Sequence, residues 1–260
     1  MGSEMCIRDS IFPAYDQIVN EMAKVRHRSG GEFWCPVTIR TPAGGGIRGG
    51  HHHSQSPESQ FTHTPGLKVV YCSTPYNAKG LLISAIEDND PVIFFEPKRC
   101  YRGPFYGDPH NVPTWSDHPE AEVPESHYKI PLGEARLAME GDRCTVISWG
   151  AMVHVCEQAI KSSGVSCDLI DLQTLVPWDV EAVVKSVAKT GRCVIVHEAP
   201  KTSGFGAEMA ASIQERCFWN LESPIERVTG WDTPFPHTTE WDYMPGPDRV
   251  IAAIVRTQED

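Results

Sequence analysis

A glycine-rich loop followed by three histidines holds the residues best suited to chemistry. Five of the seven residues 44–50 are glycine, which lets a backbone turn sharply and approach a ligand closely. The histidines, residues 51–53, follow directly, and imidazole is the side chain that titrates near neutral pH. Ser56 and Pro57 then predict a helix start, as N-cap and first helical residue. We therefore expect a site at this loop, with His53 on the approach to a helix N-terminus.

A zinc site is an alternative use of these histidines. His51, His53 and His63 could converge on one ion, but zinc sites need a fixed ligand geometry. No further Cys or carboxylate stands at a spacing that completes such a set. A metal-binding or scaffold subunit without catalysis is kept as an alternative function. A polar loop without a site is the other interpretation of the three histidines.

Composition excludes several classes of protein. The net charge of −11, without a cluster of Lys or Arg, argues against a nucleic-acid surface. No stretch approaches the roughly 18 apolar residues that a membrane span needs. Nine cysteines without CxxC spacing indicate reduced thiols in a reducing compartment. We expect a globular protein that binds neither nucleic acid nor membrane.

The first ten residues do not fit the sequence that follows. Residues 1–10 have neither the apolar core of a signal peptide nor the Arg-rich period of a transit peptide, so no targeting segment is present. Regular patterning starts abruptly at Ile11. We expect residues 1–10 to be a foreign or artefactual leader, and the natural N-terminal part to be absent.

Alternating strand and helix patterns predict an α/β fold with two domains. Residues 11–103 have the alternation of a parallel sheet covered by helices, and residues 132–260 repeat it. Residues 104–131 lose periodicity and predict a linker, with a surface insertion at residues 106–125. The predicted strands are residues 37–39, 67–71, 92–95, 145–149, 167–172, 193–196 and 225–229, and the predicted helices begin near residues 13, 56, 74, 152, 179 and 207.

Eight ordered motifs together resemble the β subunit of the E1 component of the thiamine-diphosphate-dependent 2-oxo acid dehydrogenases, in its branched-chain class. They are IFPAYDQIVNE at 11–21, HSQSPE at 53–58, HTPGLKVV at 63–70, AKGLL at 78–82, FFEPKRCYR at 94–102, LVPWDV at 175–180, HEAPKTSGFGAE at 197–208 and DTPFPH at 232–237. The resemblance implies a transketolase-like pyrimidine-binding domain, here partial, followed by a domain of the transketolase C-terminal type.

The resemblance also implies the activity and the partners. The enzyme would be an α2β2 heterotetramer that oxidatively decarboxylates branched-chain 2-oxo acids, in the catabolism of branched-chain amino acids. Thiamine diphosphate with Mg²⁺ would be held mostly by the E1 α subunit. The acyl group would pass to a lipoyl group on the dihydrolipoyl acyltransferase core. The location would be the mitochondrial matrix in a eukaryote and the cytoplasm in a bacterium.

Site residues carry over by position. His53 matches the histidine of the HSQ motif, which is expected to orient or protonate the lipoyl dithiolane. A potassium ion, which prefers oxygen ligands, is expected at a segment that the family uses for this purpose. Its predicted ligands are Pro36, Thr38, Ala85, Asp88 and Asp90. A solvated acidic helix end is the alternative for the two aspartates.

Departures from the family pattern predict a defective cofactor site. The glutamate that bonds the aminopyrimidine lies upstream of the IFPA motif in this family and has no counterpart here, so no cofactor-binding residue is retained. Ser10 stands where relatives place an aromatic residue against the pyrimidine ring. We therefore expect a chain that is inactive alone.

A rival within the same fold is the β subunit of pyruvate or acetoin dehydrogenase, which would share His53 but prefer smaller substrates. The pyruvate-using relatives share HSQ and PGLKVV but usually lack SQSPE and the FFEPK run, so branched-chain substrates are favoured.

Overall fold

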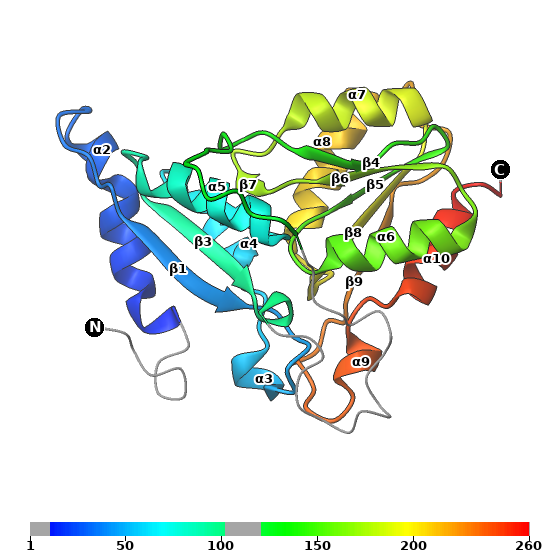
Figure 1. Cartoon of the computed structure of the whole chain (residues 1–260), viewed down its shortest axis with the longest axis horizontal. Coiled ribbons are helices and arrows are strands. Elements are labelled where there is room, and N and C mark those ends of the chain that lie inside the picture. Colours follow the sequence, from blue (N-terminus) through cyan, green and yellow to red (C-terminus); the bar gives the residue numbers. More distant parts are fainter. Residues whose placement is uncertain (1–10, 102–120, 260) are drawn as a thin grey trace.

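The computed structural model describes residues 11–101 and 121–259, which are organised around two β-sheets (Figure 1). The proposed leader, residues 1–10 with Ser10, lies outside the described residues, and so does most of the predicted insertion at residues 106–125. Within the described ranges, no helix has the length and apolar character that crossing a membrane requires. The α/β class predicted from the alternation is confirmed.

The first sheet has four strands in the order β1, β3, β2, β7. Their bounds are Thr38–Ala43 for β1, Val92–Pro97 for β3, Lys68–Tyr71 for β2 and Thr174–Val176 for β7. The first three are parallel, as predicted. The fourth, β7, comes from the second half of the chain and pairs antiparallel with β2. Sequence patterning missed β7 because three residues are too few to show a period.

Helical segments flank this sheet. The predicted helix near Pro13 is a continuous helical stretch of η1 (Phe12–Ala14), η2 (Gln17–Glu21), η3 (Met22–Lys24) and α2 (Val25–Arg28). The remaining segments are α3 (Gly50–His53), α4 (Glu58–Thr62), α5 (Pro75–Ile86) and η4 (Lys98–Cys100). As predicted, Thr74 caps α5, because its side chain accepts from the Asn77 N–H while the Asn77 side chain accepts from the Thr74 N–H.

The second sheet has five strands in the order β4, β6, β5, β8, β9. Their bounds are Arg136–Met139, Cys167–Asp171, Cys144–Ser148, Cys193–Pro200 and Glu226–Gly230. All neighbours are parallel except β4, which pairs antiparallel with β6 at the edge and was not predicted. Because successive strand residues face opposite sides, Val146 packs into one core and Ile147 into the other.

Four longer helices cover the two faces of the second sheet (Figure 1). On one face lie α6 (Met152–Ser163) and α10 (Pro247–Arg256), and on the other lie α7 (Val180–Thr190) and α8 (Phe205–Cys217). The segment between β9 and α10, which includes the short helix α9 (Glu240–Tyr243), turns back toward the first half of the chain. It meets the glycine-rich loop there, and this contact forms the candidate site.

Candidate functional site

The glycine-rich loop begins where β1 ends and runs along the second half of the chain. A Cβ atom on Gly45 would lie 2.4 Å from the Phe235 ring, and one on Gly44 would lie 2.7 Å from the Glu198 carboxylate. Gly50 lies against the His237 ring in the same way, at 3.1 Å. At these positions the close approach is to side chains from the second half of the chain, and the expected approach to a ligand stays a prediction.

Two buried carboxylates accept hydrogen bonds from the loop backbone. Glu198 accepts from the Gly45 N–H at 2.9 Å, and Glu240 accepts from the Arg48 N–H at 3.0 and 3.1 Å. Burial raises the pKa of both carboxyl groups, and backbone N–H groups oppose the rise. For Glu240 the opposing donors are the N–H groups of residues 46–48. We call Glu198 and Glu240 the loop clamp; sequence reasoning missed it, although both residues lie in or near the HEAP and DTPFPH motifs.

His53 is half-buried at the end of α3, and its backbone carbonyl accepts a hydrogen bond from the Lys98 ammonium. Its neighbours His51 and His52 are exposed, with ring centroids 4.2 Å apart. The helix begins one residue later than predicted, because Pro57 and not Ser56 is the N-cap of α4. No side chain caps that helix. His53 is itself helical, so its position is set by α3 rather than by the approach to α4.

A small hollow lies beside the histidines at the C-terminal end of β1, the edge at which parallel α/β sheets bind ligands. Its volume is about 20 Å³, close to the room that one water molecule needs. The lining residues are Ile11, Phe12, Thr41, Pro42, His52, Gln55, Pro57 and Lys98. None of these described residues is a carboxylate, and an aminopyrimidine ring needs one. The residues present therefore supply at most one wall of a thiamine diphosphate site.

A third buried acid ties α4 to the second sheet. The Trp149 indole N–H donates to the Glu58 carboxylate at 3.4 Å, and the His197 ring stacks on Trp149 with centroids 5.3 Å apart. Burial raises the pKa of Glu58 to about 7, and burial lowers the pKa of His197 to about 4. Glu58 follows the HSQSP sequence directly, so the same segment that carries His53 is anchored again one helix later.

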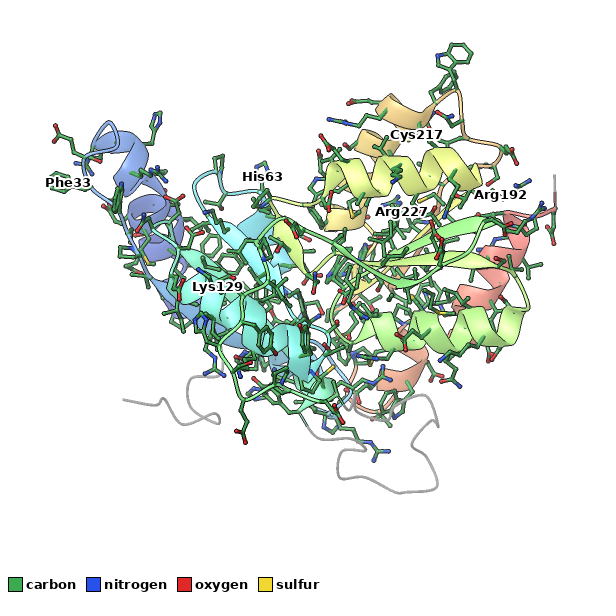
Figure 2. All side chains as sticks on the ribbon, turned by 45° about the horizontal axis from the view of Figure 1, so that its top comes forward. Phe33, His63, Lys129, Arg192, Cys217 and Arg227 are labelled. Carbon is green, nitrogen blue, oxygen red and sulfur yellow. The ribbon has the colours of Figure 1, made fainter. Side chains whose placement is uncertain are left out.

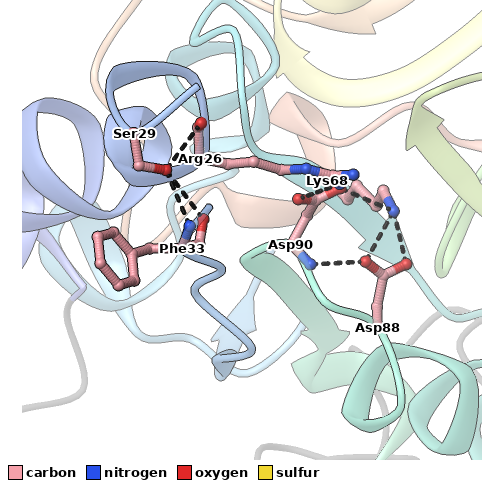
Figure 3. A network of polar contacts seen from close by, with 6 residues as sticks. All are labelled: Arg26, Ser29, Phe33, Lys68, Asp88 and Asp90. Atoms are coloured by element: carbon pink, nitrogen blue, oxygen red, sulfur yellow. Dashed lines mark hydrogen bonds and ion pairs between the residues drawn. The ribbon is translucent and has the colours of Figure 1, made fainter. Parts of the chain in front are cut away.

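Asp88 and Asp90, two of the predicted potassium ligands, lie together at the opposite end of the first sheet (Figure 3). The Lys68 ammonium lies 2.6 Å from the Asp88 carboxylate and 3.5 Å from that of Asp90, and the Arg26 guanidinium lies 2.8 Å from Asp90. Burial alone would raise the pKa of Asp90, but the bond from Arg26 and the charge of Lys68 lower it. We call the cluster formed by Arg26, Lys68, Asp88 and Asp90 the acidic corner. Its carboxylates already have cationic partners from the chain itself.

Carbonyl groups near the acidic corner are also engaged. Thr38 donates its hydroxyl to the Ala85 carbonyl at 2.8 Å, and the Asp90 N–H donates to Asp88 at 2.8 Å. The arrangement thus brings Thr38, Ala85, Asp88 and Asp90 into one region. The potassium site stays a prediction.

Convergence of histidines on a metal is not observed in the described part of the chain. His63 is exposed at the C-terminal end of α4 (Figure 2). Among residues 11–101 and 121–259, no group of three or more His, Cys, Asp or Glu side chains could hold a metal ion. The eight described cysteines are free thiols, and most are buried.

Known proteins resemble the chain over nearly its whole length. The family model for the transketolase pyrimidine binding domain matches residues 1–104, and that for the transketolase C-terminal domain matches residues 133–250. A split gene transketolase, solved as an inactive β4 tetramer, has a TM-score of 0.71 over 94% of this chain and 72% of its own. At 19% identity, that likeness concerns the fold alone.

Relatives at higher identity carry more specific names. The 2-oxoisovalerate dehydrogenase subunit beta of Pseudomonas aeruginosa is 54% identical over 98% of this chain and 73% of its own length. The mitochondrial 2-oxoisovalerate dehydrogenase subunit beta of Dictyostelium discoideum is also 54% identical, with 98% and 66% covered. The pyruvate dehydrogenase E1 component subunit beta of Acholeplasma laidlawii is 42% identical, with 94% and 71% covered. The chain thus spans about two thirds to three quarters of these relatives.

Proposed function

Since the chain belongs to the family of 2-oxoisovalerate dehydrogenase β subunits (EC 1.2.4.4), we propose that it forms one wall of a thiamine diphosphate site. The other wall, with the Mg²⁺ and most of the cofactor contacts, belongs to an E1 α subunit in an α2β2 assembly. The observation that carries the proposal is the position of His53. His53 is half-buried at the end of α3, next to His52, which lines the hollow at the C-terminal end of β1, and its segment is held by hydrogen bonds to Glu198 and from Lys98.

His53 acts on the lipoyl group rather than on the 2-oxo acid. When the dithiolane of a lipoyl domain accepts the acyl group, oxidation of the decarboxylated 2-oxo acid unit to the acyl level supplies the two electrons that break the S–S bond. One sulfur is then acylated and the other takes up a proton. A positioned imidazole can deliver that proton, which is general acid catalysis. The hydrogen bond from Lys98 to the His53 carbonyl fixes the backbone from which the ring projects. No step on the cofactor itself is assigned to this chain.

Branched-chain 2-oxo acids are the proposed substrates, and a lipoylated dihydrolipoyl acyltransferase core is the proposed acceptor. Support comes from relatives named for 2-oxoisovalerate at 54% identity, against 42% for a relative named for pyruvate. The test compares acylation of a lipoyl domain with 2-oxoisovalerate and with pyruvate, using the chain co-expressed with an α subunit. Faster turnover of pyruvate would favour the pyruvate or acetoin class instead.

The polypeptide alone is proposed to be catalytically silent. The hollow has no carboxylate among its described lining residues, so nothing there stabilises the reactive form of an aminopyrimidine. Decarboxylation of 2-oxoisovalerate is measured with the chain alone and with an α subunit present. Full activity with the chain alone would refute this proposal.

Two further proposals concern cation and location. A potassium ion bound by carbonyls near Thr38 and Ala85 would have to share the acidic corner with Lys68. A melting temperature that is higher in potassium chloride than in choline chloride of equal ionic strength would support the ion. We propose the mitochondrial matrix for a eukaryotic source, as for the Dictyostelium relative, and the cytoplasm for a bacterial one.

A further inference from the structure

We propose that Glu198 and Glu240, both from the second half of the chain, are positioning residues that hold the glycine-rich loop and thereby His53. The proposal rests on the role proposed for His53. It concerns residues 44–50, which have few side chains of their own to pack.

Glu240 makes the stronger contact. It is 1% exposed and lies at the start of α9, where both carboxylate oxygens accept from the Arg48 N–H. The N–H groups of Gly46 and Ile47 also favour the ionised form of Glu240 and oppose the rise of its pKa. A single buried carboxylate thus holds the Arg48 amide with both of its oxygens and faces the two residues before it. Charge-assisted bonds of this kind are about twice as strong as neutral ones.

Glu198 holds the start of the same loop. It lies on β8 and accepts from the Gly45 N–H, while its carboxylate is also close enough to Gly44 to exclude any side chain there. Nearby positive charges on Arg99 and Lys98 favour its ionised form. Lys98 also donates to the His53 carbonyl, so the same ammonium group that favours the ionised form of Glu198 holds the backbone of His53.

A backbone hydrogen bond within the first half of the chain also closes the loop, but it does not replace the contacts with the two glutamates. The Gly44 N–H donates to the Gln55 carbonyl at 2.8 Å, which joins the two ends of the segment. Between these ends the five glycines have wide conformational freedom, so a closed segment without the clamp would sample many loop shapes. The carboxylates of Glu198 on β8 and Glu240 on α9 select one of these shapes.

Hydrogen exchange tests the clamp without any enzyme assay. The full chain is compared with E240Q, E198Q and the control E226Q. The control alters an ion pair between Glu226 on β9 and Arg256 on α10, away from the loop. A peptide that spans residues 44–53 is followed by mass spectrometry. We expect its amides to exchange at least about tenfold faster in E240Q and E198Q, and unchanged in E226Q. Equal protection of the loop in all four proteins would overturn the proposal.

A variant that unfolds is recognised by faster exchange in β5 and β8. If E240Q unfolds, the variant E240D, which has a shorter carboxylate side chain, is used in its place. E240D keeps the charge, and we expect loop exchange between those of the parent and E240Q. Loop exchange in E240D at this intermediate rate, with β5 and β8 still protected, is the further support. Loop exchange equal to the parent in a folded E240Q contradicts the clamp.

Activity then separates this proposal from the one on which it rests. In the complex with an α subunit, E240Q should lower kcat for lipoyl acylation about tenfold or more and leave KM for 2-oxoisovalerate unchanged. If His53→Ala acylates normally, the function proposed for His53 fails, and the clamp is judged by exchange alone. If loop exchange rises while acylation in E240Q is unchanged, the positioning of His53 is refuted.

Discussion

The two carboxylates of the loop clamp and the two carboxylates of the acidic corner lie at opposite ends of the first sheet. Their hydrogen-bonding partners are of different kinds. Asp88 and Asp90 pair with the side-chain cations of Lys68 and Arg26 at partly exposed positions. Glu198 and Glu240 are buried and accept mainly from backbone N–H groups. Side-chain cations can be replaced by water and salt, whereas buried amides have no other partner. The clamp should therefore be far more sensitive to change.

The largest expected effect comes from removing a clamp carboxylate. Glu240→Ala leaves the Arg48 amide of the loop without its carboxylate partner, and we expect a loss of about 3 kcal/mol in the free energy of unfolding. Asp88→Ala in the acidic corner should cost about 1 kcal/mol or less, because exposed ion pairs contribute little. Urea unfolding measures both variants. Similar losses for the two would break the comparison.

The next effect is a pH dependence with opposite signs in the two regions. The pKa of Glu58, beside the clamp, is raised to about 7 against 4.5 for the free group. The folded state therefore binds the proton more tightly, and stability is lost as the pH rises from 4.5 through 7, by roughly 3 kcal/mol. Glu58→Gln should remove this loss. Asp90 has a lowered pKa, so its contribution is instead lost as the pH falls below about 4.

Unfolding curves of the parent, Glu58→Gln and Asp90→Asn between pH 3 and pH 8 check these slopes. The parent should lose stability relative to Glu58→Gln as the pH rises, and it should lose stability relative to Asp90→Asn as the pH falls. Parallel slopes for the two variants would contradict the assigned environments.

A smaller effect concerns the glycines. Gly45→Ala would place a methyl group 2.4 Å from the Phe235 ring, and we expect a loss of about 2 kcal/mol from overpacking. Gly30→Ala at the end of α2 meets no neighbour within 4 Å but has a positive φ of 65°. Its cost should be about 1 kcal/mol, from backbone strain alone. Thermal melting ranks the two, and a milder Gly45→Ala would show that the loop can move away from Phe235.

The smallest effect is the response to salt. Raising the ionic strength to 1 M should weaken the Lys68 and Asp88 pair, so the cost of Asp88→Ala should fall by a few tenths of a kcal/mol. The cost of Glu240→Ala should not change, because its partners are buried amides. A salt-sensitive Glu240→Ala would indicate that water reaches the clamp.

Local patterns predicted much of the fold because local physics decides those elements. Thr74 and Pro75 define the start of α5 to the residue, and the apolar run at Val92 defines β3. By contrast, β7 is three residues long and pairs across the two halves of the chain. Patterning within a segment carries no information on such a partner.

Predictions for the candidate site likewise depend on whether the contacts are local or distant in sequence. The motif that predicted His53 is local in sequence, and the role of His53 stays a prediction; the structure places this residue at the end of α3, next to His52, which lines a hollow. The contacts of the glycine-rich loop could not be predicted, because Phe235, Glu198 and Glu240 are more than 150 residues away in sequence. A buried acid whose partners are backbone amides leaves no complementary charge in the sequence to reveal it.

The most direct test of the account is a pair of rates for His53→Ala and the exposed control His51→Ala, each in complex with an α subunit. The account predicts that His53→Ala lowers acylation of a lipoyl domain about a hundredfold or more. Decarboxylation with an artificial electron acceptor should stay near the parent rate, and His51→Ala should retain both activities. Parent-like acylation of the lipoyl domain by His53→Ala would contradict the account.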